Sequence, residues 1–120
     1  MNSRLKGNGG EDYAIDTLIK DGYAILGRNF SSRFGEIDVI AEKDGIIAFI
    51  EVKTRKRGSM VTGFESITPV KIKRIIKTAE YYLCTRGCDL QPRFDVFSAI
   101  TDGGIITEYH HLEGAFVKHD

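Results

Sequence analysis

Two carboxylates and a lysine are spaced so that a β-hairpin would bring them together. Glu51 and Lys53 form a Glu-x-Lys motif at the charged end of an apolar run. Asp38 occupies the charged end of the preceding alternating run, and Asp44-Gly45 between the two runs is a strong hairpin turn signal. Because Asp38 and Glu51 are about equally far from that turn, we expect them to be near neighbours on paired strands.

This combination of side chains suits one chemistry in particular. Two neighbouring carboxylates repel each other unless a proton or a cation lies between them. Hard divalent cations such as Mg²⁺ take oxygen ligands, polarise a phosphodiester and lower the pKa of an attacking water. A lysine beside such an ion can orient or deprotonate the water, or stabilise the developing charge. The spacing therefore indicates metal-assisted phosphodiester hydrolysis, although it also allows a plain cross-strand salt bridge.

A further acid stands on the apolar stripe of the first expected helix. This helix covers residues 9–21 and ends at Gly22, and Glu11 shares a stripe with Ala14 and Leu18. An acid that faces the core needs a partner or a cation. An acid in the first turn also complements the helix dipole, so both interpretations stay open. Farther along the chain, the proximity of Asp95 to Arg93 favours a salt bridge over catalysis.

The basic residues are unevenly distributed although the chain has 17 basic and 17 acidic residues. Residues 51–77 contain eight basic and only two acidic side chains, so the remainder carries the opposite excess. Such a segment predicts contact with a polyanion, with an ordinary solvated face as the alternative. The candidate nucleic-acid contacts are Arg55, Lys56, Arg57, Lys71, Lys73 and Arg74.

The elements that must position these residues follow from periodicity and turn signals. We expect helices over residues 9–21 and 68–86, a turn over 30–33, a basic loop over 55–67, and strands over 23–29, 34–42, 46–54, 94–100 and 105–110. The order predicts an α/β fold, a single domain over residues 1–120 in which helices flank a mixed central sheet. Alternation in the second strand places on one face Ile37, Val39 and Ala41, and on the other Glu36, Asp38 and Ile40.

Composition excludes several classes of protein. With 42% apolar and 28% charged residues, the chain resembles an ordinary globular domain. It has no run of about 18 apolar residues and no secretion signal, so we expect no membrane partner. Two cysteines are too few for a disulfide scaffold, and with three histidines they lack the spacing of a zinc site. We therefore expect a reducing, cytoplasmic location.

Short motifs along nearly the whole chain resemble, in their order, those of the YraN family. They are residues 10–11, 22–23, 28–29, 35–40 (GEIDVI), 49–55 (FIEVKTR), 67–71 (ITPVK), 93–96 (RFDV) and 115–116. YraN proteins are similar to the restriction-endonuclease-like fold, whose superfamily includes Holliday junction resolvases, restriction enzymes and tRNA-processing nucleases. The resemblance thus implies an αβββαββ core of that type.

The resemblance also implies roles for the residues singled out above. Glu11, Asp38, Glu51 and Lys53 would form the catalytic site. Asp38 and Glu51 would be metal ligands with the Val52 carbonyl as a further ligand, Glu11 would support a metal or a water, and Lys53 would be the catalytic lysine. The implied activity is that of a Mg²⁺- or Mn²⁺-dependent endonuclease.

The implied substrate is nucleic acid, with DNA favoured over RNA and branched DNA among the candidates. A non-catalytic nucleic-acid-binding or interaction module on the same fold is the alternative. A homodimer stays open as well, because many enzymes of this fold cut two strands as dimers.

Overall fold

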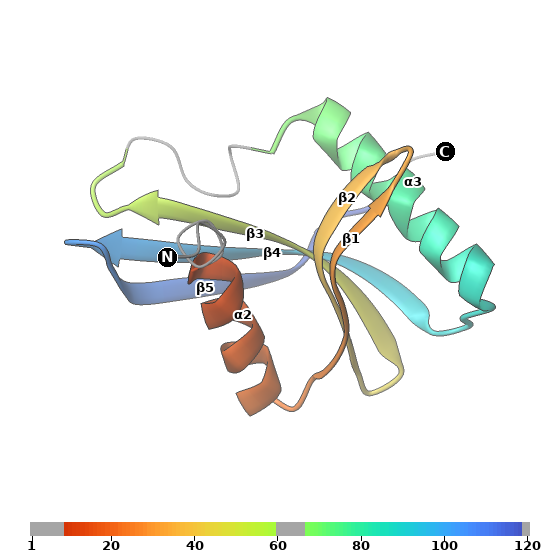
Figure 1. Cartoon of the computed structure of the whole chain (residues 1–120), viewed down its shortest axis with the longest axis horizontal. Coiled ribbons are helices and arrows are strands. Elements are labelled where there is room, and N and C mark those ends of the chain that lie inside the picture. The colour runs from red at the N-terminus through yellow and green to blue at the C-terminus, as the bar shows by residue number, and fades with distance from the viewer. Residues whose placement is uncertain (1–8, 60–66, 119–120) are drawn as a thin grey trace, which may run out of the picture.

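The computed structural model describes residues 9–59 and 67–118 of the chain. In order, these residues form α2 (Gly9–Lys20), β1 (Ala24–Ser32), β2 (Gly35–Lys43), β3 (Ile46–Lys56), α3 (Pro69–Arg86), β4 (Gln91–Asp102) and β5 (Ile105–Phe116) (Figure 1). The expected order of helix, three strands, helix and two strands is confirmed. The expected basic loop is partly replaced by the end of β3, and its residues 60–66 lie outside the described residues.

The five strands form one mixed sheet in the order β1-β2-β3-β4-β5. Neighbouring strands are antiparallel except for β3 and β4, which are parallel and are joined through α3. Ala14 and Leu18 of α2 pack with Ala48 and Ile50 in one apolar core, whereas the core around α3 contains Ile47 and Phe49. Since alternate residues of a strand point to opposite faces, the two helices cover opposite faces of the sheet, as Figure 1 shows.

The central strand β3 explains why its sequence does not alternate between apolar and polar residues. Ile47, Ala48, Phe49 and Ile50 all have no solvent exposure, because α2 covers one face of the strand and α3 covers the other. The apolar run ends at Glu51, which leaves the charged residues of the strand at the end where the sheet opens. Within the described part of the chain, neither helix combines the length and the apolar character needed to cross a membrane.

The ends of α3 follow the expected capping chemistry. The Thr68 hydroxyl accepts a hydrogen bond from the Lys71 backbone N–H at 3.2 Å, and Pro69 begins the helix. Gly87 ends it in the left-handed conformation, with φ of 59°. These residues are read from the local sequence because each cap involves only its own neighbours.

Several expected strands are too short, since β3 and β4 also extend beyond the expected 46–54 and 94–100, and for β1 and β5 aromatic packing explains the difference. Residues 30–32 of the expected turn over 30–33 are part of β1, which continues because Phe30 packs edge-on against Tyr82, with centroids 5.1 Å apart. The turn itself lies at residues 33–34. Likewise, β5 extends to Phe116, whose ring stacks on Phe94 at 5.4 Å. Both contacts join residues far apart in the sequence, so periodicity could not reveal them.

The expected alternation along β2 is also wrong, and it breaks at Asp38. Ile37 lies in the α3-side core with Ile40, whereas Val39 lies in the α2-side core. Asn29, which faces Asp38 in the β1–β2 register, has φ of 53°, and the pairing of β2 with β3 stops one residue before Asp38. The β1–β2 hairpin therefore twists away from β3 and leans over α3 (Figure 1).

Helix α2 approaches β3 closely at Gly10, where a Cβ atom would lie 2.2 Å from Oγ1 of Thr54. We expect Gly10→Ala to lower the free energy of unfolding by about 1–3 kcal/mol because of this overlap, as measured by urea unfolding. Gly9→Ala is the matched control, since its Cβ would meet nothing within 4 Å. The double variant with Thr54→Ala should recover most of the loss, and a loss that persisted there would contradict the overlap.

Candidate active site

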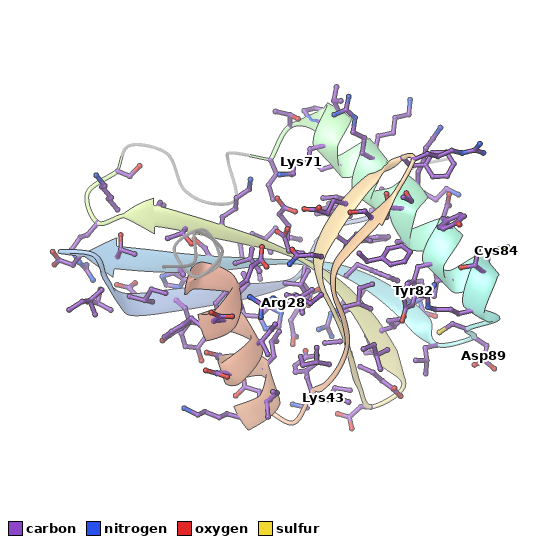
Figure 2. The ribbon with its side chains drawn as sticks, in the orientation of Figure 1. Arg28, Lys43, Lys71, Tyr82, Cys84 and Asp89 are labelled. Carbon is purple, nitrogen blue, oxygen red and sulfur yellow. The ribbon has the colours of Figure 1, made fainter. Side chains whose placement is uncertain are left out.

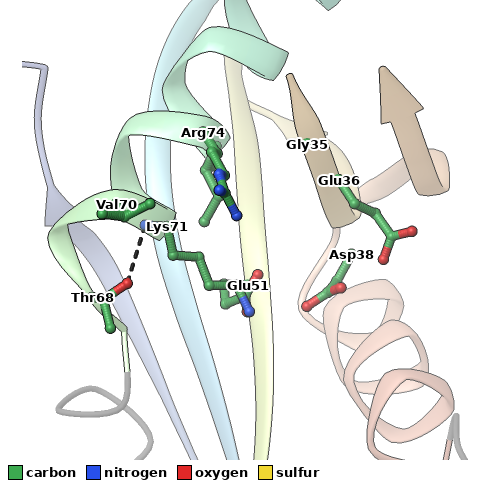
Figure 3. A pocket seen from close by; sticks show the side chains of 9 residues that line it. Gly35, Glu36, Asp38, Glu51, Thr68, Val70, Lys71 and Arg74 are labelled. Atoms are coloured by element: carbon green, nitrogen blue, oxygen red, sulfur yellow. Dashed lines mark hydrogen bonds and ion pairs between the residues drawn. The ribbon is translucent and has the colours of Figure 1, made fainter. Parts of the chain in front are cut away.

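A cleft of about 380 Å³ opens where β2 leaves β3, opposite the first turns of α3. Its walls come from three segments that are distant in the sequence, and Figure 3 shows their side chains converging. Among the lining residues are Gly35, Glu36, Asp38, Glu51, Lys71 and Arg74. The cleft thus contains two of the four expected catalytic residues, together with two of the expected phosphate contacts.

Asp38 is held at the opening of the sheet by a backbone hydrogen bond. Its Oδ2 accepts from the Val52 N–H at 2.8 Å, so the carboxylate takes the place of the next carbonyl in the β2–β3 ladder. Burial, repulsion by Glu51 and the nearby charge of Glu11 raise the pKa of Asp38 to about 7, although the Val52 N–H works against the rise. Near neutral pH this carboxyl is therefore present in both its protonated and its charged form.

Glu51 is almost completely buried, with 4% of its side chain exposed, and two ammonium groups contact one of its oxygens. Oε2 lies 3.2 Å from Nζ of Lys53 and 2.5 Å from Nζ of Lys71. Burial disfavours the charged form of Lys71, but the Glu51 carboxylate outweighs burial and raises the pKa of Lys71. Figure 2 shows Lys71 reaching from the start of α3 toward the sheet.

The contact between Lys71 and Glu51 was not expected from the sequence, which indicated only a phosphate contact. One local signal was available, because Lys71 stands in the first turn of α3, where the helix dipole disfavours a cation. A buried carboxylate opposite that turn accounts for the placement. That this carboxylate is Glu51 could not be predicted, because it depends on how α3 docks on the sheet.

Glu11 of α2 does not line the cleft, and it contacts Arg28 of β1. Its Oε1 is 3.5 Å from Nε of Arg28, which binds Asp12 more closely, at 2.6 Å. The same Glu11 oxygen is buried and has no hydrogen-bond partner. Since Glu11 also contributes to the raised pKa of Asp38, its charge acts on the cleft and not only on the helix dipole. Arg28 lies between α2 and the β1–β2 hairpin (Figure 2).

The donor atoms here fit a hard divalent cation in their chemistry. Asp38 and Glu51 supply carboxylate oxygens, and Oε1 of Glu11, which accepts no hydrogen bond from the described residues, belongs to a carboxylate that acts electrostatically on Asp38. Even so, among the described residues no three Asp, Glu, His or Cys side chains already converge as a metal site. The ammonium group of Lys71 lies 2.5 Å from Oε2 of Glu51, an oxygen that a cation could otherwise bind, and it therefore competes with an ion for this carboxylate.

The expected nucleic-acid contacts do not form one surface. On α3, Lys71 and Arg74 line the cleft, whereas Lys73 lines a separate groove beside Ile72 and Lys77. The helix therefore divides its basic residues between two faces, as its period of 3.6 residues per turn requires.

The remaining expected contacts, Arg55, Lys56 and Arg57, continue β3 beyond Lys53. Arg57 is bound by the carboxylates of Asp102 and Glu108 at 3.5 and 3.2 Å, while Nε of Arg55 is buried without a hydrogen-bond partner. Lys56 and Arg57 line a separate hollow beside Asp102, and Arg57 is already neutralised.

Asp95 belongs to a separate buried network, and the expected salt bridge is present. It is fully buried and accepts hydrogen bonds from Arg93 at 2.8 and 2.9 Å, from the Gly114 N–H at 3.0 Å, and contacts Nε2 of His111 at 2.8 Å. Burial opposes ionisation of Asp95, but these contacts outweigh it and lower its pKa. The network joins β4 to β5 and stays outside the cleft.

The elements that build the cleft all lie within the part of the chain that matches a known family model. Residues 10–99 match the model of a family described as uncharacterised protein family UPF0102. The chain belongs to the UPF0102 family. The matched segment includes Glu11, Asp38, Glu51 and Lys53, and it ends within β4. The resemblance to YraN is thereby confirmed.

Several UPF0102 proteins are similar to this chain over much of its length. One from Persephonella marina is 45% identical over 119 residues, which cover 97% of each chain. Another from Fusobacterium nucleatum is 45% identical over 103 residues, 85% of this chain and 87% of its own. A third from Clostridium perfringens is 53% identical over 74 residues, 62% of this chain and 61% of its own.

Proposed function

We propose that this UPF0102 protein is a divalent-metal-dependent nuclease whose active site is the cleft between β2, β3 and α3. The observation that carries the proposal is the close pair of carboxylates, Asp38 and Glu51, at a cleft that also contains cations. A second, half-buried carboxylate beside the buried Glu51 is costly, and a structural salt bridge does not need it. A cation-binding site does need it, because hard cations require several oxygen ligands.

Asp38, Glu51 and the Val52 carbonyl would hold the ion, Mg²⁺ or Mn²⁺. When bound, such an ion polarises the phosphodiester and lowers the pKa of the attacking water. Asp38 gives up its proton near neutral pH, which frees its oxygens for a cation. Glu11, whose Oε1 accepts no hydrogen bond from the described residues and pairs only with Arg28 at 3.5 Å, adds negative charge near Asp38 and would support a ligand or a water.

Lys53 and the two basic residues that line the cleft would act on the substrate. Lys53, beside Glu51, is placed to orient or deprotonate the water or to stabilise charge that develops on the phosphate. Lys71 and Arg74 stand on the opposite wall, where they would contact phosphates on either side of the cut. DNA is the proposed polymer.

One observation favours a second candidate, a binding module that does not cleave. The ammonium groups of Lys53 and Lys71 already neutralise Glu51, so the cleft is electrostatically satisfied without a metal ion. In that case the basic residues would bind nucleic acid, and the carboxylates would serve only to position them. The two functions differ in whether the protein takes up metal ions.

Mn²⁺ titration of the wild type and of Glu51→Gln separates these functions. We expect the wild type to bind Mn²⁺ and to cut labelled linear, flapped or four-way-junction DNA only with the ion. Glu51→Gln should lose at least about 100-fold in Mn²⁺ affinity, because a metal ligand is removed. Glu36→Gln is the matched control, since Glu36 is an exposed acid of the same cleft, and it should bind and cut as the wild type does.

The other possible results of this titration would identify the binding module or a purely structural role. DNA binding without Mn²⁺ uptake or cutting would identify a binding module. If neither DNA nor Mn²⁺ bound, the carboxylates and lysines would be a structural salt-bridge network.

A further inference from the structure

An aromatic side chain projects from α3 next to the cleft. Tyr81 is 45% exposed, although the rings of Phe30 and Phe34 hold it in place with centroids 6.3 Å from its own. Tyr81 lines a hollow of about 360 Å³ together with Phe34, Lys77, Cys84 and Glu80, whose carboxylate is paired with Lys118. A ring that is held by its neighbours and keeps an open face can stack a nucleic-acid base.

Three cations surround the route between this ring and the cleft. Arg33 lies at the β1–β2 turn with its guanidinium carbon 5.0 Å from the Phe34 ring centroid, and Nζ of Lys77 lies 5.9 Å from the same centroid. Arg74 stands one helical turn before Lys77. Within residues 9–59 and 67–118, none of these three cations forms an ion pair with a carboxylate. This unmatched positive charge favours an anionic ligand.

The cleft and the hollow at Tyr81 adjoin each other. Gly35 and Arg74 line the cleft, while Phe34 and Lys77, their neighbours along the chain and the helix, line the hollow. Gly35 packs so closely on α3 that a Cβ atom there would lie 3.1 Å from Cβ of Arg74. At about 1.5 Å per residue, Arg74 and Tyr81 are about 10 Å apart along the helix axis. A short run of nucleotides can therefore reach from one to the other.

We propose that Arg33, Phe34, Arg74, Lys77 and Tyr81 bind an unpaired DNA strand that runs to the cleft, with a base stacked on Tyr81. The proposal rests on the proposed nuclease function and names its substrate class. A duplex hides the faces of its bases within the stack, whereas an unpaired strand exposes them to an aromatic ring. The substrate is thus DNA with a single-stranded segment beside the cut, such as a flap, rather than a blunt duplex.

Binding measured by fluorescence anisotropy in EDTA tests this surface without any cleavage. The probes are a labelled oligothymidine, a blunt DNA duplex and an oligouridine RNA. We expect Tyr81→Leu, which keeps apolar bulk but loses the ring, to weaken oligothymidine binding about tenfold and duplex binding less than about twofold. Tyr109→Leu is the matched control, because Tyr109 is 38% exposed and lies on β5. It should leave both affinities unchanged.

The proposal is overturned if Tyr81→Leu weakens both DNA probes equally, or if it weakens neither, as expected when the surface serves a protein partner. Tighter, ring-dependent binding of oligouridine would overturn the choice of DNA. Mn²⁺ uptake by the same variants separates this proposal from the proposed function. If Tyr81→Leu weakens oligothymidine binding but the wild type takes up no Mn²⁺, the strand-binding surface is supported and the nuclease function is rejected. If the wild type and Tyr81→Leu bind oligothymidine and cut DNA equally well with Mn²⁺, the nuclease function is supported and the strand-binding surface is rejected.

Discussion

Asp38→Asn should abolish metal-dependent cleavage and at the same time stabilise the fold above neutral pH. The amide keeps the size of the carboxyl and can still accept from the Val52 N–H, so the opening of the sheet is preserved. It cannot carry the negative charge that a metal ion requires. We expect cleavage to fall by at least about 10³-fold, which corresponds to a loss of roughly 4 kcal/mol of transition-state stabilisation.

The stability effect has a sign that follows from the raised pKa of Asp38, about 7 in the folded protein. In the unfolded chain an aspartic acid ionises near pH 4, so between these values the folded state binds the additional proton. The free energy of unfolding of the wild type therefore falls as pH rises from about 4 to about 7, and it stays lower above that range. Asp38→Asn has no such proton, so its advantage should grow to the order of 2–4 kcal/mol by pH 8.

Urea unfolding at pH 5 and pH 8 measures this difference. Asp16→Asn is the matched control, because Asp16 is an exposed acid on α2 and its replacement should give no pH-dependent gain. Mn²⁺ should raise the stability of the wild type at pH 8 and leave Asp38→Asn unchanged, since only the wild type binds the ion. A stability difference that is the same at both pH values would contradict the raised pKa.

Replacing each of the two lysines at Glu51 by methionine should have different effects on cleavage and on Mn²⁺ affinity. Lys53→Met should lower kcat for cleavage by about 10²–10⁴-fold and leave Mn²⁺ affinity nearly intact, because Lys53 is assigned to the water and the phosphate. Lys71→Met should bind Mn²⁺ more tightly than the wild type, because Lys71 competes with the ion for Oε2 of Glu51. It should bind DNA more weakly, since a phosphate contact is removed.

Single-turnover cleavage together with Mn²⁺ titration distinguishes these roles. Each variant first needs a far-ultraviolet circular dichroism spectrum like that of the wild type, because both lysines contact a buried carboxylate. Equal losses of cleavage in the two variants would mean that both lysines only neutralise Glu51. Loss of Mn²⁺ binding in Lys53→Met would show that Lys53 holds the carboxylates in place and does not act on the substrate.

The sequence by itself determined the elements and the central pair of residues. Asp44 and Gly45 both adopt positive φ, 54° and 80°, as a tight hairpin turn requires, and counting outward from them placed Asp38 opposite Glu51. The capping residues of α3 were equally readable. These features could be predicted because a turn or a cap involves residues within a few positions of one another, whose local preferences suffice.

Only the tertiary structure decided how the cleft is opened and which charges meet in it. The twist at Asp38, the contact of Lys71 with Glu51 and the contact of Arg28 with Glu11 all join segments that are distant in the sequence. Nor could charge counts reveal that Arg57 is neutralised by acids of neighbouring strands. Side-chain pairing of this kind depends on where each helix and strand docks. Docking is decided by apolar packing over the whole sheet. The periodicity of one segment shows only which of its own residues share a face, so it does not predict this packing.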